Sequence, residues 1–125
     1  MKVCVLGIGF MGFPMARRLC EAGFTVHAWN RSREKAERLA PCGATVHALA
    51  SDAVRDADIV VCLLENGAVV GDVLFAQGAA AAMKAGALVI DMSSIKPREA
   101  REHAARLREM GIAHMDAPVS GGTVG

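Results

Sequence analysis

A chain of 125 residues, 53% of them hydrophobic, is long enough to form one domain with a buried core. Its formal net charge of +1, with both signs interspersed, gives no reason to expect nucleic acid or a membrane surface as a partner. No apolar run approaches the roughly 20 residues that a membrane-spanning helix needs, and the first run stops at Gly7, too early for a signal peptide. We therefore expect a cytoplasmic protein.

Strands and helices are predicted to alternate along the whole chain. Short apolar runs of strand character are each followed by a segment with helical periodicity or helix-favouring composition. We expect strands at residues 2–6, 25–29, 44–47, 58–64, 87–90 and 112–115, and helices at residues 13–22, 32–40, 51–55, 68–75, 78–84 and 98–110. This order predicts an α/β fold with a doubly wound, mostly parallel sheet of about six strands, the Rossmann fold.

The first predicted strand runs directly into the glycine motif GxGxxG. Gly7 permits a tight turn, Gly9 lets the backbone approach a phosphate, and Gly12 lets the helix pack closely on the strand. Free N–H groups and the dipole at the helix amino terminus then attract an anion. The motif predicts a dinucleotide pyrophosphate site formed by Gly7, Ile8, Gly9, Phe10, Met11 and Gly12.

The segment after the second predicted strand indicates which coenzyme is bound. Sites for NAD, FAD or S-adenosylmethionine usually have Asp or Glu there, to bind ribose hydroxyls, whereas this chain has Asn30. Arg31 can contact a 2′-phosphate with its planar guanidinium, and Lys35 can add a charge. Asn30 and Ser32 can add neutral hydrogen bonds. We therefore predict NADP(H), with NAD less favoured. The alternative is a solvated turn in which Ser32 merely caps the next helix.

Two further loops follow the fourth and fifth predicted strands, where ligands of open α/β sheets bind. Leu64 ends the fourth strand, and Ser94 follows the fifth. The Ser94 hydroxyl can reach the ribose next to the nicotinamide, so both residues are candidates for cofactor contact. An ST-turn before the helix that Pro97 begins is the alternative role of Ser94.

The cysteines and histidines form no pattern typical of redox or metal chemistry. There is no CxxC pair, and Cys4 and Cys62 fall in predicted buried strands, where a thiol packs as a small hydrophobic group. The four histidines lack metal-ligand spacing with each other or with cysteine. We therefore expect neither a disulfide nor a metal ion.

Five segments of the chain together resemble the β-hydroxyacid dehydrogenase family: GIGFMGFPMA, AWNRS, DIVVCLLE, VIDMSSIKP and DAPVSGG. This family includes 3-hydroxyisobutyrate dehydrogenase, tartronate semialdehyde (2-hydroxy-3-oxopropionate) reductase and glyoxylate/succinic semialdehyde reductases. The resemblance implies that residues 1–125 are the NADP-binding domain of an oxidoreductase for a short hydroxy acid or semialdehyde. It implies the cofactor contacts given above, and a loop that holds the substrate carboxylate, formed by Ser120, Gly121 and Gly122.

The family's catalytic lysine matches none of Lys2, Lys35, Lys84 and Lys96. The resemblance therefore implies that this lysine lies beyond residue 125, in a helical second domain that also makes most of a homo-oligomer. We expect no catalytic residue within this chain, and NADP binding without turnover. The alternative function is a catalytically silent NADP-binding module for interaction or sensing.

Overall fold

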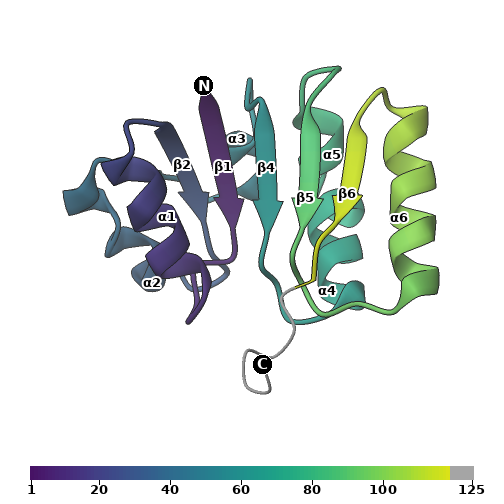
Figure 1. Ribbon diagram of the computed structural model, residues 1–125, viewed down its shortest axis with the longest axis horizontal. Coiled ribbons are helices and arrows are strands. Elements are labelled where there is room, and N and C mark those ends of the chain that lie inside the picture. Colours follow the sequence, from purple (N-terminus) through teal and green to yellow (C-terminus); the bar gives the residue numbers. More distant parts are fainter. Residues whose placement is uncertain (119–125) are drawn as a thin grey trace.

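Residues 1–118 are described in the computed structural model of this chain. Its six strands are β1 (Lys2–Leu6), β2 (Thr25–Trp29), β3 (Thr45–Val46), β4 (Ile59–Cys62), β5 (Leu88–Asp91) and β6 (Ala113–Asp116). They form one sheet in the order β3-β2-β1-β4-β5-β6, and every neighbouring pair is parallel (Figure 1). The predicted doubly wound α/β fold is confirmed.

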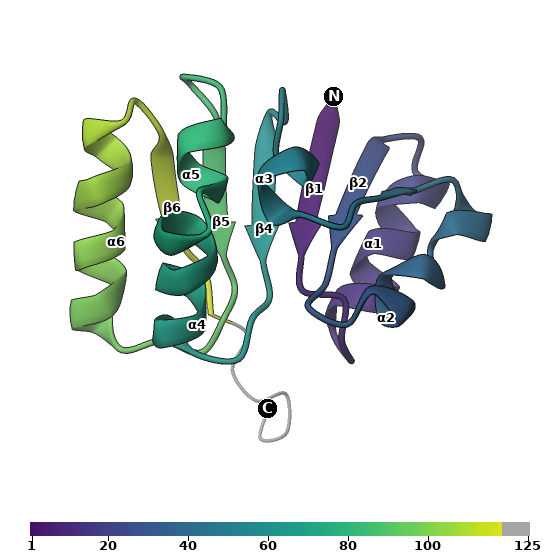
Figure 2. The ribbon, with the colours of Figure 1, turned by 180° about the vertical axis from the view of Figure 1, so that it is seen from behind.

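Helices cover both faces of the sheet. They are α1 (Gly12–Glu21), α2 (Arg33–Glu37), α3 (Ala50–Ala53), α4 (Gly67–Gly71), α5 (Ala79–Ala82) and α6 (Pro97–Glu109), with a 3₁₀-helix η1 (Ala40–Cys42) and a π-helical segment η2 (Asp72–Ala76) that continues α4. One face packs on α1 and α2, and the other on α3, α4, η2, α5 and α6. Figure 2 shows α3, α4 and α5 in front of the sheet and α6 beside β6. None of the helices within residues 1–118 is long and apolar enough to cross a membrane.

The core is built from the alternating strand residues that these helices cover. Cys4, Val60 and Cys62 face α3 to α6 and are fully buried, as the sequence predicts for a parallel sheet covered on both faces. Val5 and Val26 face α1 and α2 on the other side. Both cores lie next to the strands, one on each face of the sheet. The loops at the carboxyl edge of the sheet therefore begin from strands that are held by packing on both faces.

Most predicted element ends differ from the structure by one or two residues, and two of the differences bear on the loops near the carboxyl edge of the sheet. The predicted helix at residues 32–40 ends at Glu37, and a separate 3₁₀-helix follows, in which Pro41 has no N–H to donate to an α-helical bond. The predicted strand at residues 58–64 ends at Cys62, so its last two residues belong to a loop at the sheet edge. This loop contributes to the cavity described next.

Candidate functional site

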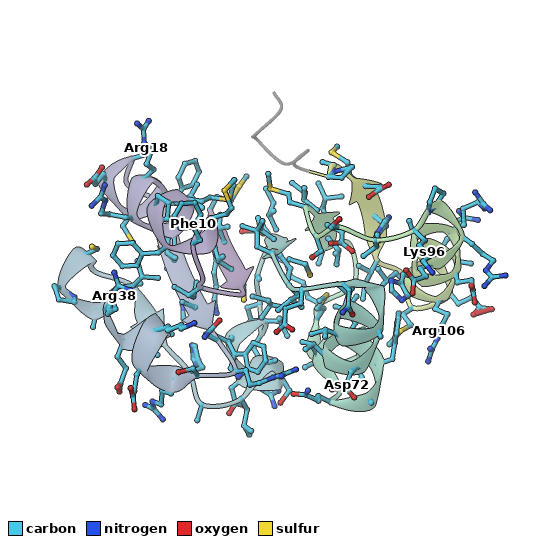
Figure 3. All side chains as sticks on the ribbon, turned by 90° about the horizontal axis from the view of Figure 1, so that it is seen from below. Phe10, Arg18, Arg38, Asp72, Lys96 and Arg106 are labelled. Atoms are coloured by element: carbon cyan, nitrogen blue, oxygen red, sulfur yellow. The ribbon has the colours of Figure 1, made fainter. Side chains whose placement is uncertain are left out.

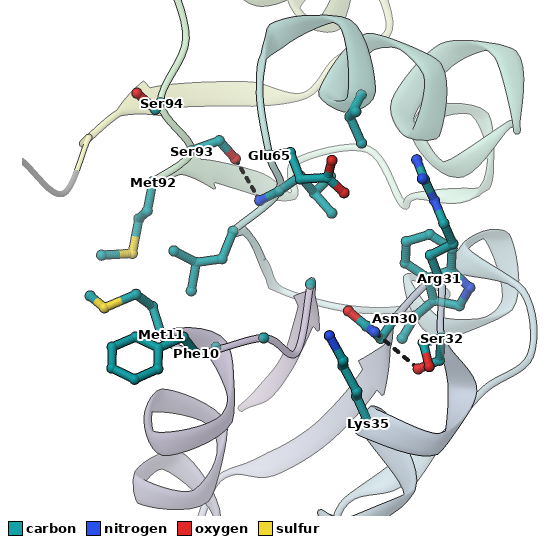
Figure 4. A pocket seen from close by; sticks show the side chains of 17 residues that line it. Phe10, Met11, Asn30, Arg31, Ser32, Lys35, Glu65, Met92, Ser93 and Ser94 are labelled. Carbon is teal, nitrogen blue, oxygen red and sulfur yellow. Dashed lines mark hydrogen bonds between the residues drawn. The ribbon is translucent and has the colours of Figure 1, made fainter. Parts of the chain in front are cut away.

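A cavity of about 900 Å³ opens at the carboxyl edge of the sheet. It lies between β1 and β4, where the chain order of the strands reverses and where ligands of open parallel sheets bind. Its walls are the loops after β1, β2, β4 and β5 (Figure 4), and the lining residues are Gly7, Gly9, Phe10, Met11, Gly12, Trp29, Asn30, Arg31, Ser32, Lys35, Leu63, Leu64, Glu65, Val69, Met92, Ser93 and Ser94.

The glycine motif forms the loop between β1 and α1, as predicted. Gly7 has a φ of 105°, and a Cβ there would overlap the Leu63 carbonyl oxygen. A Cβ on Gly12 would overlap the Gly7 carbonyl oxygen, so α1 begins in direct contact with the turn. At Gly9 a Cβ would meet nothing within 4 Å, because the backbone there faces open space. Two of the glycines are therefore required by packing, and the third exposes backbone to the cavity.

The other residues of this loop divide between the core and the cavity. Ile8 is 1% exposed and packs in the core beneath α1 and α2, so its side chain does not line the cavity. Phe10 is 94% exposed and lies just before α1. Figure 3, which views the molecule from the carboxyl edge of the sheet, shows Phe10 at this position. Met11 precedes α1 and makes no side-chain capping bond to its first turn. The helix amino terminus thus presents main-chain groups near the cavity.

Asn30 makes two hydrogen bonds within the protein. Its Oδ1 accepts a hydrogen bond of 2.8 Å from the Ile8 N–H, and its Nδ2 donates one of 2.9 Å to the Ser32 carbonyl oxygen. The side chain therefore ties the glycine loop to the segment after β2. The contact of Asn30 with the coenzyme stays a prediction, since Oδ1 and Nδ2 each keep a second hydrogen-bonding position.

Two cationic side chains project into the same end of the cavity as Asn30. Arg31 and Lys35 both line it (Figure 4), and within residues 1–118 neither makes an ion pair with a protein carboxylate. Ser32 immediately precedes α2, but its side chain makes no capping hydrogen bond, so the alternative in which Ser32 merely caps the helix is not supported. Among the lining residues that the structure describes, Glu65 is the single acidic one.

The opposite end of the cavity is formed by the loops after β4 and β5. Leu64 and Ser94 both line it, as predicted, and Ser93 lies between them. Ser93 is 2% exposed, and its Oγ accepts a hydrogen bond of 2.9 Å from the Leu64 N–H (Figure 4). Its own N–H donates to Oδ1 of Asp91, a fully buried carboxyl at the end of β5. Burial raises the pKa of Asp91, while the hydrogen bonds from Ser93 act in the opposite direction.

Sequence reasoning missed several lining residues. These are Trp29, Leu63, Glu65, Val69, Met92 and Ser93. Most of them adjoin a predicted residue at the carboxyl end of a strand, so the position of the strand ends was the available signal. Conversely, Ser120, Gly121 and Gly122 lie outside the described residues. Within residues 1–118 no group of three or more His, Cys, Asp or Glu side chains could hold a metal ion.

Comparison with known protein families identifies the domain. A family model described as the NAD binding domain of 6-phosphogluconate dehydrogenase matches residues 2–125. The chain belongs to this family. Its glycine loop, cavity and strand order are thus those of a pyridine nucleotide-binding domain, and the sequence resemblance to the β-hydroxyacid dehydrogenases is confirmed.

Characterised relatives are dehydrogenases and reductases of small molecules. The chain is 42% identical over 122 residues to L-threonate dehydrogenase of Cupriavidus necator, and 38% identical over 125 residues to NAD-dependent L-serine dehydrogenase of Pseudomonas aeruginosa. These alignments cover 97% and 99% of this chain but 41% and 42% of the relatives. The chain therefore spans about two fifths of the length of these enzymes.

A solved structure gives the same picture. The structure of Mycobacterium tuberculosis 3-hydroxyisobutyrate dehydrogenase with L-serine superposes with a TM-score of 0.90 at 36% identity. The superposition covers 96% of this chain and 40% of that chain. Together with the family match, this makes the chain a nucleotide-binding domain of the hydroxyacid dehydrogenase family.

Proposed function

We propose that this domain binds NADP(H) in preference to NAD(H), within an oxidoreductase that transfers a hydride between the nicotinamide and a short β-hydroxy acid or semialdehyde. The observation that carries the coenzyme choice is the end of β2, where Arg31 and Lys35 line the cavity and no carboxylate occupies position 30. Such carboxylates bind the ribose hydroxyls of NAD and repel a 2′-phosphate.

The physical reason is the charge of the 2′-phosphate, which carries nearly two negative charges. Arg31 offers a planar set of donors that fits phosphate oxygens, and Lys35, near the start of α2, adds a second positive charge. Neither is committed to a protein carboxylate within residues 1–118, so neither has to break an ion pair to bind the ligand. The Ser32 hydroxyl adds a neutral donor.

The rest of the cavity fits the remaining parts of the coenzyme. The open backbone at Gly9 and the uncapped start of α1 offer N–H groups to a pyrophosphate. Leu64 and Ser94 line the opposite end, where the nicotinamide and its ribose would lie. The bound nicotinamide supplies or accepts the hydride, and the role of this chain's residues is to hold and orient it.

The substrate assignment rests on the family resemblance and on the relatives. We propose that Ser120, Gly121 and Gly122 hold the substrate carboxylate through the serine hydroxyl and backbone N–H groups. The relatives act on small hydroxy acids or aldehydes, as the names L-threonate dehydrogenase and 2-hydroxy-3-oxopropionate reductase state. Tartronate semialdehyde, glyoxylate and succinic semialdehyde are the substrates to test first.

We further propose that a helical second domain supplies the catalytic lysine and most of the contacts of a homo-oligomer. Carbonyl reduction needs a proton donor within hydrogen-bond reach of the carbonyl oxygen. Part of the sheet also favours additional covering elements, because Met115 is 50% exposed and Leu88 and Ile90 are half-buried on the side of β5 and β6 away from α6. Residues 1–125 alone should then bind coenzyme without measurable turnover.

Calorimetric titration of the chain with NADPH, NADH and S-adenosylmethionine tests the proposal. We expect NADPH to bind at least about tenfold more tightly than NADH, which corresponds to about 1.4 kcal/mol, and S-adenosylmethionine to bind more weakly than either. Equal or tighter binding of NADH would refute the coenzyme assignment. Turnover of a semialdehyde by residues 1–125 at an ordinary enzymatic rate would refute the assignment of the catalytic lysine to a second domain.

A further inference from the structure

The loops after β4 and β5 are joined by one buried side chain, Ser93. Its Oγ accepts from the Leu64 N–H at 2.9 Å and donates to the Cys62 carbonyl oxygen at 3.3 Å. Its N–H donates to Asp91 Oδ1 at 2.9 Å. Three hydrogen bonds thus connect one residue to both strands, and Ser93 itself is 2% exposed. The hydroxyl has little access to solvent and is committed to the protein.

These bonds take the place of a regular backbone rung. In a parallel ladder, the residue that donates to the carbonyl of one neighbour also accepts from the amide two positions further along that strand. Met92 donates its N–H to the Cys62 carbonyl oxygen at 2.9 Å, so the Met92 carbonyl would be the regular acceptor for Leu64 N–H. That amide bonds to the Ser93 hydroxyl instead. The segments that follow β4 and β5 therefore separate at this point, but the Ser93 side chain still joins them.

The segment after β4 is held from its other side as well. Leu63 donates its N–H to the Leu6 carbonyl oxygen at 2.9 Å, and the Leu63 carbonyl and Leu64 side chain lie against Gly7 of the glycine loop. The consecutive amides of Leu63 and Leu64 therefore bond to the end of β1 and to Ser93, respectively. The position of Leu64, which lines the cavity, is set by both.

We propose that Ser93 is a positioning residue that holds the two walls of the nicotinamide end of the cavity, Leu64 on one side and Ser94 on the other, at a fixed separation. This inference rests on the proposed function, since it assigns that end of the cavity to the nicotinamide. Asp91 orients Ser93 in turn through its accepted N–H bond. Ser93 borders the cavity, but its hydroxyl is committed to the Leu64 N–H and the Cys62 carbonyl oxygen, so it acts on the coenzyme through Leu64 and Ser94.

The test compares a whole dinucleotide with its adenosine half. In the proposed binding mode NADPH would reach both ends of the cavity, whereas 2′,5′-ADP would reach Arg31 and the glycine loop but not Leu64. We expect Ser93→Ala to weaken NADPH binding about tenfold and to leave 2′,5′-ADP within about twofold of wild type, as the loss of one buried hydrogen-bond partner predicts. Ser51→Ala is the matched control, because Ser51 lies on α3 and does not line the cavity.

A second variant covers the case in which Ser93→Ala does not fold. Ser93→Cys nearly conserves side-chain size but replaces the hydroxyl with a weak hydrogen-bonding group, so it should show the same difference between the two ligands. Amide hydrogen exchange on the wild-type chain adds a ligand-free readout. The Leu64 amide should exchange far more slowly than exposed loop amides in wild type, and faster in either variant.

Each outcome decides the inference. Equal losses for NADPH and 2′,5′-ADP, or no loss for NADPH, would overturn the positioning role, as would a Leu64 amide that exchanges freely in wild type. If the wild-type chain prefers NADH, the proposed coenzyme choice fails while the positioning role is judged by the same comparison of NADH with AMP. A wild-type chain that binds no dinucleotide would overturn both proposals.

Discussion

Asn30 Oδ1 accepts the Ile8 N–H at 2.8 Å, so the side chain that directly follows β2 holds the glycine loop in place. A carboxylate at the same position would keep this acceptor but lose the Nδ2 bond to the Ser32 carbonyl oxygen, and it would add a negative charge beside Arg31. The amide therefore serves two purposes. It stabilises the loop, and it leaves the end of β2 uncharged.

Two substitutions at this position separate these purposes. Asn30→Ala removes the acceptor for the Ile8 N–H. Because both coenzymes bind the glycine loop, the binding of NADPH and the binding of NADH should weaken by a similar factor of about tenfold. Asn30→Asp keeps the acceptor but repels the 2′-phosphate, so the binding of NADPH should weaken about tenfold more than the binding of NADH. Calorimetry with both coenzymes measures the ratio. An unchanged NADPH-to-NADH ratio in Asn30→Asp would contradict the electrostatic explanation.

Alanine substitutions at two glycines of the glycine loop should have different effects on thermal stability. Gly12→Ala places a Cβ against the Gly7 carbonyl oxygen, so its melting temperature should fall by about 5 °C or more, although alanine is ordinarily the better helix former. Gly9→Ala has open space around its Cβ, so it should melt within about 2 °C of wild type and bind NADPH more weakly. Thermal unfolding and titration check both. A strongly destabilised Gly9→Ala would contradict the assignment of Gly9 to ligand approach.

The predictable part of this molecule is the part encoded locally. A strand, three spaced glycines and a helix are contiguous, so the sequence placed the glycine loop correctly, including the contact that Gly12 makes with the turn. The apolar runs likewise predicted the six strands and the burial of Cys4 and Cys62 in them. The end of the second helix was wrong by three residues, since helical periodicity in a charged segment does not show where the last α-helical bond forms.

The residues that sequence reasoning missed depend on how separate strands meet. Ser93 and Ser94 are adjacent serines, and which of them points inward is decided by the bend that follows β5 and by the Leu64 amide opposite. The partner of Asn30 is Ile8, 22 residues earlier, a contact that no local pattern reveals. Such side-chain bonds between strand ends require the register of the sheet, which only the structure provides.

The histidine pair on β2 and after β3 predicts a loss of stability in acid. His27 Nδ1 and His47 Nε2 are 2.7 Å apart, and a hydrogen bond between two imidazoles requires that at least one ring is neutral. Burial lowers the pKa of both rings, with nearby Lys2 acting in the same direction and Asp52 opposing it at His47.

The sign of the effect follows from these shifts. Because the folded-state pKa lies below the unfolded value of about 6.5, the unfolded chain takes up more protons, and stability is lost as the pH falls below that value. The melting temperature should therefore fall between pH 7.5 and 5.5. His47→Gln should reduce this fall without abolishing it, because burial also lowers the pKa of His114. A fall of the same size in His47→Gln would rule out the pair as its source.

Arg31 and Arg33 provide the sharpest test of the coenzyme assignment, because they carry the same charge two residues apart. Arg31 lines the cavity, whereas Arg33 lies on α2, 3.3 Å from Glu37 in an exposed ion pair, and does not line it. A long-range effect of net charge would be similar for both, and only a direct contact distinguishes them.

Arg31→Ala should therefore weaken NADPH binding by about tenfold or more and change NADH binding by less than about twofold, since charge-assisted bonds to phosphate are the stronger kind. Arg33→Ala should leave both coenzymes within about twofold of wild type, because an exposed ion pair contributes little. The slope of log affinity against log salt should also become shallower in Arg31→Ala for NADPH. Comparable losses in the two variants would show that the cation at position 31 acts by general charge rather than by contact with the 2′-phosphate.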